Sequence, residues 1–277
     1  MNLGPSAYPG SRLPILLAHG IAPFHRLLPF PSSRDNASDD RFHYFRRIRS
    51  TLLSHGFTAF HTRVSWGGSL ERRASDLRAE ILRITRHFSR WPRVHIIGHS
   101  MAGLDARYMI YRHRMEGRVA SLTTIGTPHL GTAYADWGLR KYGFLIQAAR
   151  PLGLDLSGFT SLSRDRCAGF NKVVDDFEEH NGVRYRTVAG VQPFHRMFRF
   201  FRFPYIIIRH EEGENDGMVS LRSALWKEKY LLEIMDADHI NQIGWWDRSE
   251  AQTGVPREKY ERGIRQVYLN IAGMLRD

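Results

Sequence analysis

The feature that most constrains this chain is an apolar run that ends in a serine set among small residues. Residues 93–103 read RVHIIGHSMAG. The β-branched residues favour a strand up to Gly98, and a helical pattern follows, so Ser100 stands at the apex of a strand–turn–helix unit. Strand and helix pass close together in such a turn, which requires small residues at Gly98, Ala102 and Gly103. The backbone at the apex is strained and pushes the serine hydroxyl into a cleft.

This unit matches the nucleophile elbow G-x-S-x-G except at its last position. Ala102 replaces that glycine, and Gly103 follows it. Alanine is the smallest substitute for glycine, so we expect the turn to tolerate it. The alternative is a turn in which Ser100 only caps a helix, but the flanking strand and helix patterns favour the elbow.

Strand and helix patterns alternate along the rest of the chain. Predicted strands cover residues 13–18, 57–61, 93–98, 119–125, 184–189, 205–209 and 230–235, and predicted helices cover 42–53, 69–89 and 257–275. Such alternation favours an α/β fold with a mostly parallel central sheet covered by helices on both faces. No repeat or low-complexity linker interrupts it, so we predict a single domain over residues 1–277.

Residues 133–165 interrupt this alternation. They mix aromatic residues, glycines and leucines without a strand pattern. They follow the predicted strand 119–125, so they emerge at the edge of the sheet where ligands bind in such folds. We predict a helical lid inserted here, and the alternative is an ordinary core helix.

A serine nucleophile needs a base, and a carboxylate must orient that base. On this scaffold the chain order is serine, acid, histidine. Asp216 lies in the turn NDG after the predicted strand 205–209, and His239 is the only histidine that follows it. Both would lie at loop tips on the same sheet edge as Ser100. We therefore predict the catalytic residues Ser100, Asp216 and His239.

Other acids compete with Asp216 for this role. They lie in the same loop or beside the histidine: Glu211, Glu212, Glu214, Asp236 and Asp238. An aspartate before glycine is also common in turns without catalytic function. Two further histidines flank the predicted site; we expect His99 to pack beside the elbow and His129 to line the cleft or support its loop.

The oxygen of an attacked ester carbonyl becomes negative and needs backbone N–H donors. One donor is expected on the residue after the nucleophile, Met101. The other is expected in the loop after the first strand, where His19-Gly20-Ile21 follows. We predict an oxyanion hole made by the amides of Ile21 and Met101.

Several segments together resemble the α/β-hydrolase superfamily and, more narrowly, bacterial triacylglycerol lipases. They are LLAHG at 16–20, GHSMAG at 98–103, TTIGTPHLGT at 123–132, NDGMVS at 215–220 and DH at 238–239. The resemblance implies an ester-hydrolysing fold with a mobile lid after Thr132. It assigns the same triad of Ser100, Asp216 and His239.

The chain also departs from the secreted members of that family. These members hold a structural calcium through an acid two residues after the catalytic histidine and another before the catalytic aspartate. Here the first position is Asn241, and residues 181–210 contain no acid. Calcium prefers carboxylate ligands, so we predict no metal site, and nothing in the sequence calls for a cofactor. Cys167 is the single cysteine, which excludes an internal disulfide and suits a reducing compartment.

The chain carries a formal net charge of +12. Such a charge would attract nucleic acid or acidic lipid headgroups. The arginines are spread along the chain and no nucleic-acid-binding motif is present, so we expect no nucleic-acid partner. In residues 193–203, phenylalanines alternate with arginines. This stretch predicts either a transient contact with a lipid interface or a half-buried strand with arginines in solvent.

No apolar run reaches the roughly 18 residues of a membrane-spanning helix, and residues 1–12 lack a signal-peptide pattern. We therefore predict a cytoplasmic location. The sequence predicts a serine carboxylic ester hydrolase that acts through an acyl-enzyme, with an apolar insertion that favours medium or long acyl chains. The alternatives are a small-ester carboxylesterase, an acyltransferase on the same triad, and a non-catalytic binding protein on the hydrolase fold. The oligomeric state stays open.

Overall fold

A computed structural model describes residues 12–21, 39–149 and 157–277. Six strands in these residues form one parallel sheet in the order β2-β1-β3-β4-β5-β6. The strands are β1 (Ile15–Ala18), β2 (Ala59–His61), β3 (Val94–His99), β4 (Val119–Ile125), β5 (Arg184–Val191) and β6 (Leu231–Asp236). The parallel sheet confirms the predicted α/β-hydrolase fold class.

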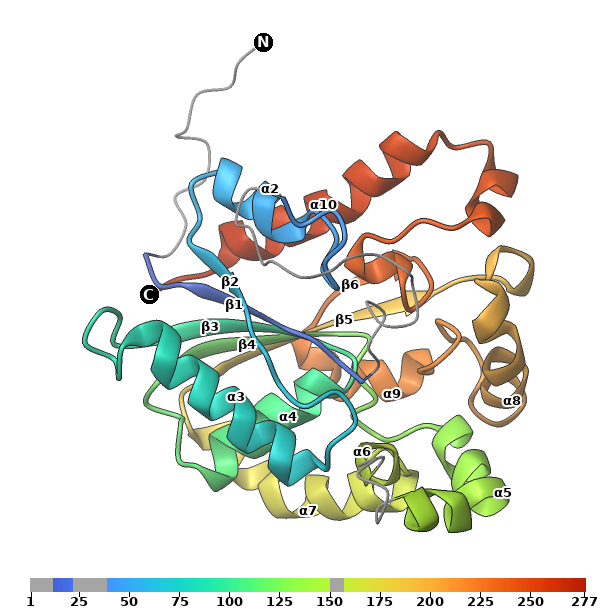
Figure 1. Ribbon diagram of the computed structural model, residues 1–277, viewed down its shortest axis with the longest axis horizontal. Coiled ribbons are helices and arrows are strands. Elements are labelled where there is room, and N and C mark those ends of the chain that lie inside the picture. The colour runs from blue at the N-terminus through green and yellow to red at the C-terminus, as the bar shows by residue number, and fades with distance from the viewer. Residues whose placement is uncertain (1–11, 22–38, 150–156) are drawn as a thin grey trace.

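Helices cover both faces of this sheet (Figure 1). On one face lie α2 (Ile48–Ser54) and α10 (Arg257–Met274), and on the other α3 (Leu70–Thr85), α4 (Met101–Arg112) and α7 (Arg164–His180). Alternate strand residues therefore serve two cores: Leu17 and Ile97 pack in the first, whereas Leu16 and Ile96 pack in the second. Because both faces are buried there, the central strands β1 and β4 are buried along their whole length, whereas β5 and β6 also carry exposed charged residues.

The prediction of a strand at 205–209 is wrong, because these residues lie in the helix α8 (Arg202–Glu212). The run YIII has high β-propensity, which suggested a strand. Its burial nevertheless follows helical spacing: Pro204 and Ile208 are buried, while Ile206 between them is exposed. Pro204 lies in the first turn, where its missing N–H breaks no helical hydrogen bond.

The predicted helix 42–53 is shorter than expected. Its regular part begins at Ile48, after Arg47 in a left-handed conformation with φ 58°. The predicted helix 69–89 is α3, which Ser69 caps by accepting a hydrogen bond from the amide of Arg72. It ends at Thr85, and Arg86 after it is again left-handed.

After β4 the chain enters a helical region. This region contains α5 (Ala133–Ala149) and α6 (Ser157–Thr160), and α7 begins at Arg164. The segment 133–165 is thus mostly helical where it is described, with a short turn at 161–163, and its residues 150–156 lie outside the described part. Its role as a lid stays a prediction, as does the single domain. A search of the described helices found none with the length and apolar character needed to cross a bilayer.

Candidate active site

Ser100 occupies the sharp turn between β3 and α4. Its backbone has φ 58° and ψ −133°, a conformation that residues other than glycine seldom adopt. A Cβ on Gly98 would lie 3.0 Å from the Gly103 nitrogen, and one on Gly103 would overlap the side chain of Thr127. These two positions therefore require glycine. Ala102, by contrast, places its methyl group in the core between sheet and helix, which explains why alanine fits there.

The three predicted catalytic side chains lie in one hydrogen-bonded chain. The Ser100 Oγ lies 3.0 Å from His239 Nε2, and His239 Nδ1 lies 2.8 Å from Asp216 Oδ2. A carboxylate can only accept a hydrogen bond, so Nδ1 donates its proton to Asp216 and Nε2 is left to accept the serine proton. His239 is 5% exposed and Asp216 1%, which keeps water away from the bond between them.

The carboxylate of Asp216 is held by further donors. Its Oδ1 accepts hydrogen bonds from the amides of Met218 at 2.9 Å and Val219 at 2.7 Å. Its Oδ2 accepts a third from Gln242 Nε2 at 2.7 Å. A Cβ on Gly126, which has φ 54°, would overlap the Gln242 amide. The sequence prediction missed Gln242, since only the fold brings it beside the acid.

Asp216 lies where predicted, although the strand expected before it is a helix. The amide of Gln192, next after β5, donates to the Asn215 carbonyl at 3.3 Å and holds the turn at the end of that strand. The competing acids have other partners. Glu211 pairs with Arg164, and Asp236 pairs with Arg196.

Asp238, which precedes His239, is hydrogen-bonded by backbone amides. Its oxygens accept hydrogen bonds from the amides of Phe198, Ile240 and Asn241 at 2.9–3.0 Å. Burial raises the pKa of Asp238 to about 8, although these three donors act in the opposite direction. It orders the loop around His239 and does not replace Asp216.

The two predicted oxyanion donors stand on either side of the serine. Met101 is the first residue of α4, and Ile21 follows β1 after a short loop. A Cβ on Gly20 would lie only 2.6 Å from Ser100 Cβ, so the loop passes directly beside Ser100. Within the described residues, neither the Ile21 nor the Met101 amide has a hydrogen-bond acceptor. Both amides therefore remain able to bind an incoming oxygen.

A tyrosine that sequence reasoning missed supports this loop. The Tyr44 hydroxyl accepts a hydrogen bond from the Gly20 amide at 3.1 Å and lies 2.7 Å from His99 Nδ1, to which it can donate. The His99 ring in turn packs 4.5 Å from the ring of His239. Burial holds the pKa of His99 well below its usual value, so a neutral ring packs against the imidazole of His239 beside the turn, as expected.

Arg73 also acts on this loop and was missed. It is fully buried, with Nη2 2.7 Å from the His19 carbonyl oxygen, and Nε donates to Asp105 Oδ2 at 2.8 Å. A third contact goes to the Ser65 carbonyl. Asp105 lies on α4, so the arginine ties the loop after β1 to the helix that begins at the nucleophile. Burial raises the pKa of Asp105 to about 6 against the opposing effect of Arg73. An arginine on the apolar face of α3, with Leu70 and Leu77, was the available signal.

His129 supports the loop after β4. It lies 3.1 Å from Arg107 Nη1 and 2.8 Å from the Thr124 hydroxyl, and its ring stacks on Trp226 at 4.5 Å. Arg107 is bound to Glu178 of α7. Burial lowers the pKa of His129 well below its usual value. This is the supporting role that the sequence suggested.

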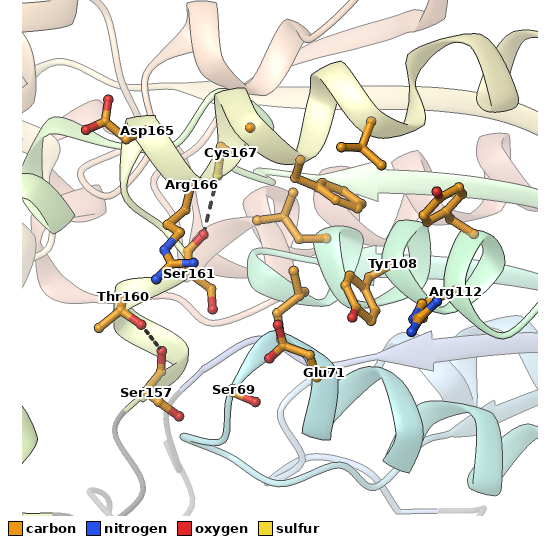
Figure 2. Close-up of a pocket in the computed structure, with 16 residues that line it drawn as sticks. Ser69, Glu71, Tyr108, Arg112, Ser157, Thr160, Ser161, Asp165, Arg166 and Cys167 are labelled. Carbon is orange, nitrogen blue, oxygen red and sulfur yellow. Dashed lines mark hydrogen bonds between the residues drawn. The ribbon is translucent and has the colours of Figure 1, made fainter.

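A cavity of about 530 Å³, shown in Figure 2, is not lined by Ser100, Asp216 or His239. Side chains of α3, α4, α6 and α7 line it, including Leu104, Tyr108 and Cys167. Burial raises the pKa of the Cys167 thiol to about 12, so this cysteine is no competing nucleophile. In the described ranges no three His, Cys, Asp or Glu side chains are grouped as a metal site would require.

Comparisons with known proteins show which proteins the chain is similar to. A family model described as "PGAP1-like alpha/beta domain" matches residues 39–149. The chain is 26% identical to triacylglycerol lipase 2 of Saccharomyces cerevisiae over 87% of this chain and 83% of that protein. It is also 26% identical to the triacylglycerol lipase of Pseudomonas fragi, over 90% and 94%. The crystal structure of mature Bacillus licheniformis lipase BlEst2 superposes with a TM-score of 0.65 at 22% identity, covering 86% of this chain and 89% of that one.

Sheet order, elbow and loop-tip histidine define an α/β-hydrolase, and the solved lipase shares that fold. The relatives to which the chain is similar over most of its length are named triacylglycerol lipases.

Proposed function

We propose that the chain is a serine hydrolase of carboxylic esters that uses Ser100, His239 and Asp216. The observation that supports this most strongly is the hydrogen-bonded chain from the strained Ser100 through His239 to Asp216. A serine hydroxyl is a poor nucleophile until a base removes its proton. His239 Nε2 lies within reach of that proton, and the buried carboxylate favours the imidazolium that forms.

The reaction then runs in two steps. Ser100 attacks the ester carbonyl while His239 takes its proton, and the tetrahedral oxyanion is met by the amides of Ile21 and Met101. His239 returns the proton to the leaving alcohol, which leaves an acyl group on Ser100. Water, deprotonated by the same imidazole, releases the acid and restores the serine. Each oxyanion donor contributes about 10²–10³ in rate in related chemistry.

The surroundings of the oxyanion donors favour an apolar acyl chain. Ile21 and Met101 pack in one apolar cluster with Leu70 and Leu104. The ring of Phe201 lies 6.1 Å from that of His239 on the other side. The named relatives are triacylglycerol lipases, which adds support for esters of medium or long acyl chains.

Two further parts of the proposal concern access to the site. Residues 133–165 act as a lid, since α5 follows the loop beside Ser100 and packs against α8. Esters of long acids gather in aggregates rather than dissolve, so the enzyme contacts a lipid–water surface transiently during turnover.

A series of p-nitrophenyl esters tests the substrate class. We expect kcat/KM, obtained from initial rates, to rise from acetate to butyrate and octanoate. Ser100→Ala, measured in parallel, should reduce each rate to the background. A steep optimum at acetate would replace the lipase assignment by a small-ester esterase, and turnover that survives in Ser100→Ala would remove the triad from the mechanism.

A further inference from the structure

The segment that follows β5 exposes large apolar side chains. It comprises the 3₁₀ turns η2 (Phe194–Arg196) and η3 (Arg199–Phe201) and the helix α8. Phe200 is 81% exposed, Ile206 55% and Phe203 52%. The opposite side of the same segment is buried through Phe201 and Ile208. The segment thus has two apolar sides, and only one of them is covered by protein.

The uncovered side continues onto α5. The ring of Trp137 packs 5.0 Å from that of Phe203, and the ring of Tyr142 packs 5.7 Å from Trp137. Tyr142 is itself 49% exposed. Figure 1 shows α5 and α8 on the same side of the molecule. We call the surface formed by Phe200, Phe203, Ile206 and Tyr142 the α8 face.

Exposed cations lie on both elements of this surface. Arg199 and Arg209 are exposed on the segment itself, and Lys141 is exposed on α5. Glu211, near the end of α8, is paired with Arg164 at 2.7 Å. The face therefore combines insertable aromatic rings with positive charge. Proteins that lie in the interface of anionic bilayers use this combination, because rings enter the acyl boundary while arginines meet phosphate headgroups.

The α8 face lies one layer of side chains from the candidate site. Phe201, adjacent to the exposed Phe200, packs against the His239 ring. The Phe198 amide donates to Asp238, next to the same histidine, at 2.9 Å. A surface that binds Phe200 and Phe203 would therefore lie directly beside the loop that carries the base.

We propose that the α8 face docks on anionic phospholipid surfaces, with Phe200 and Phe203 inserted and Arg199 and Arg209 against headgroup phosphates. The role of this docking, which is to bring ester to Ser100, rests on the proposed function. The binding itself can be measured without turnover. Exposed phenylalanines contribute nothing to phosphate contacts along a nucleic acid, so they favour a lipid surface over that other polyanion.

Sedimentation with vesicles tests the docking, in the full chain carrying Ser100→Ala so that lipid is not consumed. Two vesicle types are compared, phosphatidylcholine alone and phosphatidylcholine with one-third phosphatidylglycerol. We expect binding to the anionic vesicles to be at least about tenfold tighter, and to weaken as salt is raised because headgroup charges are screened. Equal affinity for both vesicle types, or binding to neither, would overturn the proposal.

Variants separate the two contributions. Phe200→Ser with Phe203→Ser should weaken binding to anionic vesicles about tenfold or more, whereas Val173→Ser, at an apolar position 60% exposed on α7, should not. Arg199→Gln with Arg209→Gln should remove the preference for anionic vesicles. The matched pair Arg78→Gln and Arg90→Gln, which removes two exposed charges elsewhere, should retain it.

Activity and folding measurements separate the possible failures. The variant Phe200→Ser with Phe203→Ser, made with Ser100 retained, should hydrolyse the dissolved ester p-nitrophenyl butyrate at the parent rate, which would show that it is folded. Vesicle binding by a chain that hydrolyses no ester would reject the proposed function and keep the docking. Binding to RNA that depends on Arg199 and Arg209, without vesicle binding, would replace the lipid by a nucleic acid.

Discussion

Replacing Asp216 by asparagine changes one atom in the series of hydrogen bonds that links Asp216 through His239 to Ser100. The donors around Asp216 determine which way the asparagine amide points. The amides of Met218 and Val219 both donate to Oδ1, so the asparagine oxygen must stay at that position. Its nitrogen then takes the place of Oδ2 and donates to His239 Nδ1. The imidazole proton is forced onto Nε2, where it points at the serine oxygen and prevents that nitrogen from acting as a base.

The size of the effect follows from this change of tautomer. Loss of the correct tautomer in a serine–histidine–aspartate site lowers kcat about 10⁴-fold, which corresponds to about 5.5 kcal/mol of activation free energy. The folded state should lose much less. Gln242, which now donates to Oδ2, can rotate its amide and accept from the new nitrogen, so we expect a loss of only about 1 kcal/mol.

The assay measures kcat on p-nitrophenyl butyrate together with the thermal midpoint. Asp236→Asn serves as the matched control, because this exposed acid pairs with Arg196 rather than with the histidine, and it should keep kcat within about twofold. A folded Asp216→Asn that stays within about tenfold of the parent kcat would show that a group other than Asp216 orients the base.

Two further predictions concern buried groups. Arg73→Lys keeps the charge but loses the planar guanidinium that reaches both Asp105 and the His19 carbonyl, so kcat should fall about tenfold with KM nearly unchanged. The control is Arg107→Lys, at an equally buried arginine bound to Glu178, which should lower the thermal midpoint without a selective loss of kcat. Equal effects of the two substitutions on kcat would contradict the role given to Arg73. Burial raises the pKa of Asp238 from 3.8 to about 8, so between these values the native state holds a proton that the unfolded chain has released. The free energy of unfolding should therefore fall as pH rises from about 4 to about 8, and Asp238→Asn should flatten this slope in urea titrations; an unchanged slope would show that this carboxyl is ionised throughout.

Local patterns predicted much of the fold. The apolar run before Gly98 predicts a strand, and the small residues after it predict a close turn. Both predictions depend only on residues that are neighbours in the sequence. The predicted strand at 119–125 coincides with β4. The error at 205–209 has a local cause, because three consecutive isoleucines favour a strand while the burial of Pro204 and Ile208 depends on partners far along the chain.

The three proposed catalytic residues were chosen by chain order rather than by packing. His239 was the only remaining histidine, and Asp216 was chosen partly for a preceding strand that is a helix. The structure brings both beside Ser100, and their catalytic role stays a prediction. Gln242, Tyr44 and Arg73 escaped prediction for a common reason. Each contacts a loop distant in sequence, and a single side chain carries no local signal of such a partner.

The most direct test of the account is covalent labelling with a fluorophosphonate, followed by peptide mass spectrometry. We expect one label per chain, on the peptide that contains Ser100, and slower labelling in His239→Ala because the base is missing. Ser100→Ala should take up none. Equal labelling of the parent and Ser100→Ala, or a label mapped to a different serine, would contradict the claim that this strained turn carries the nucleophile.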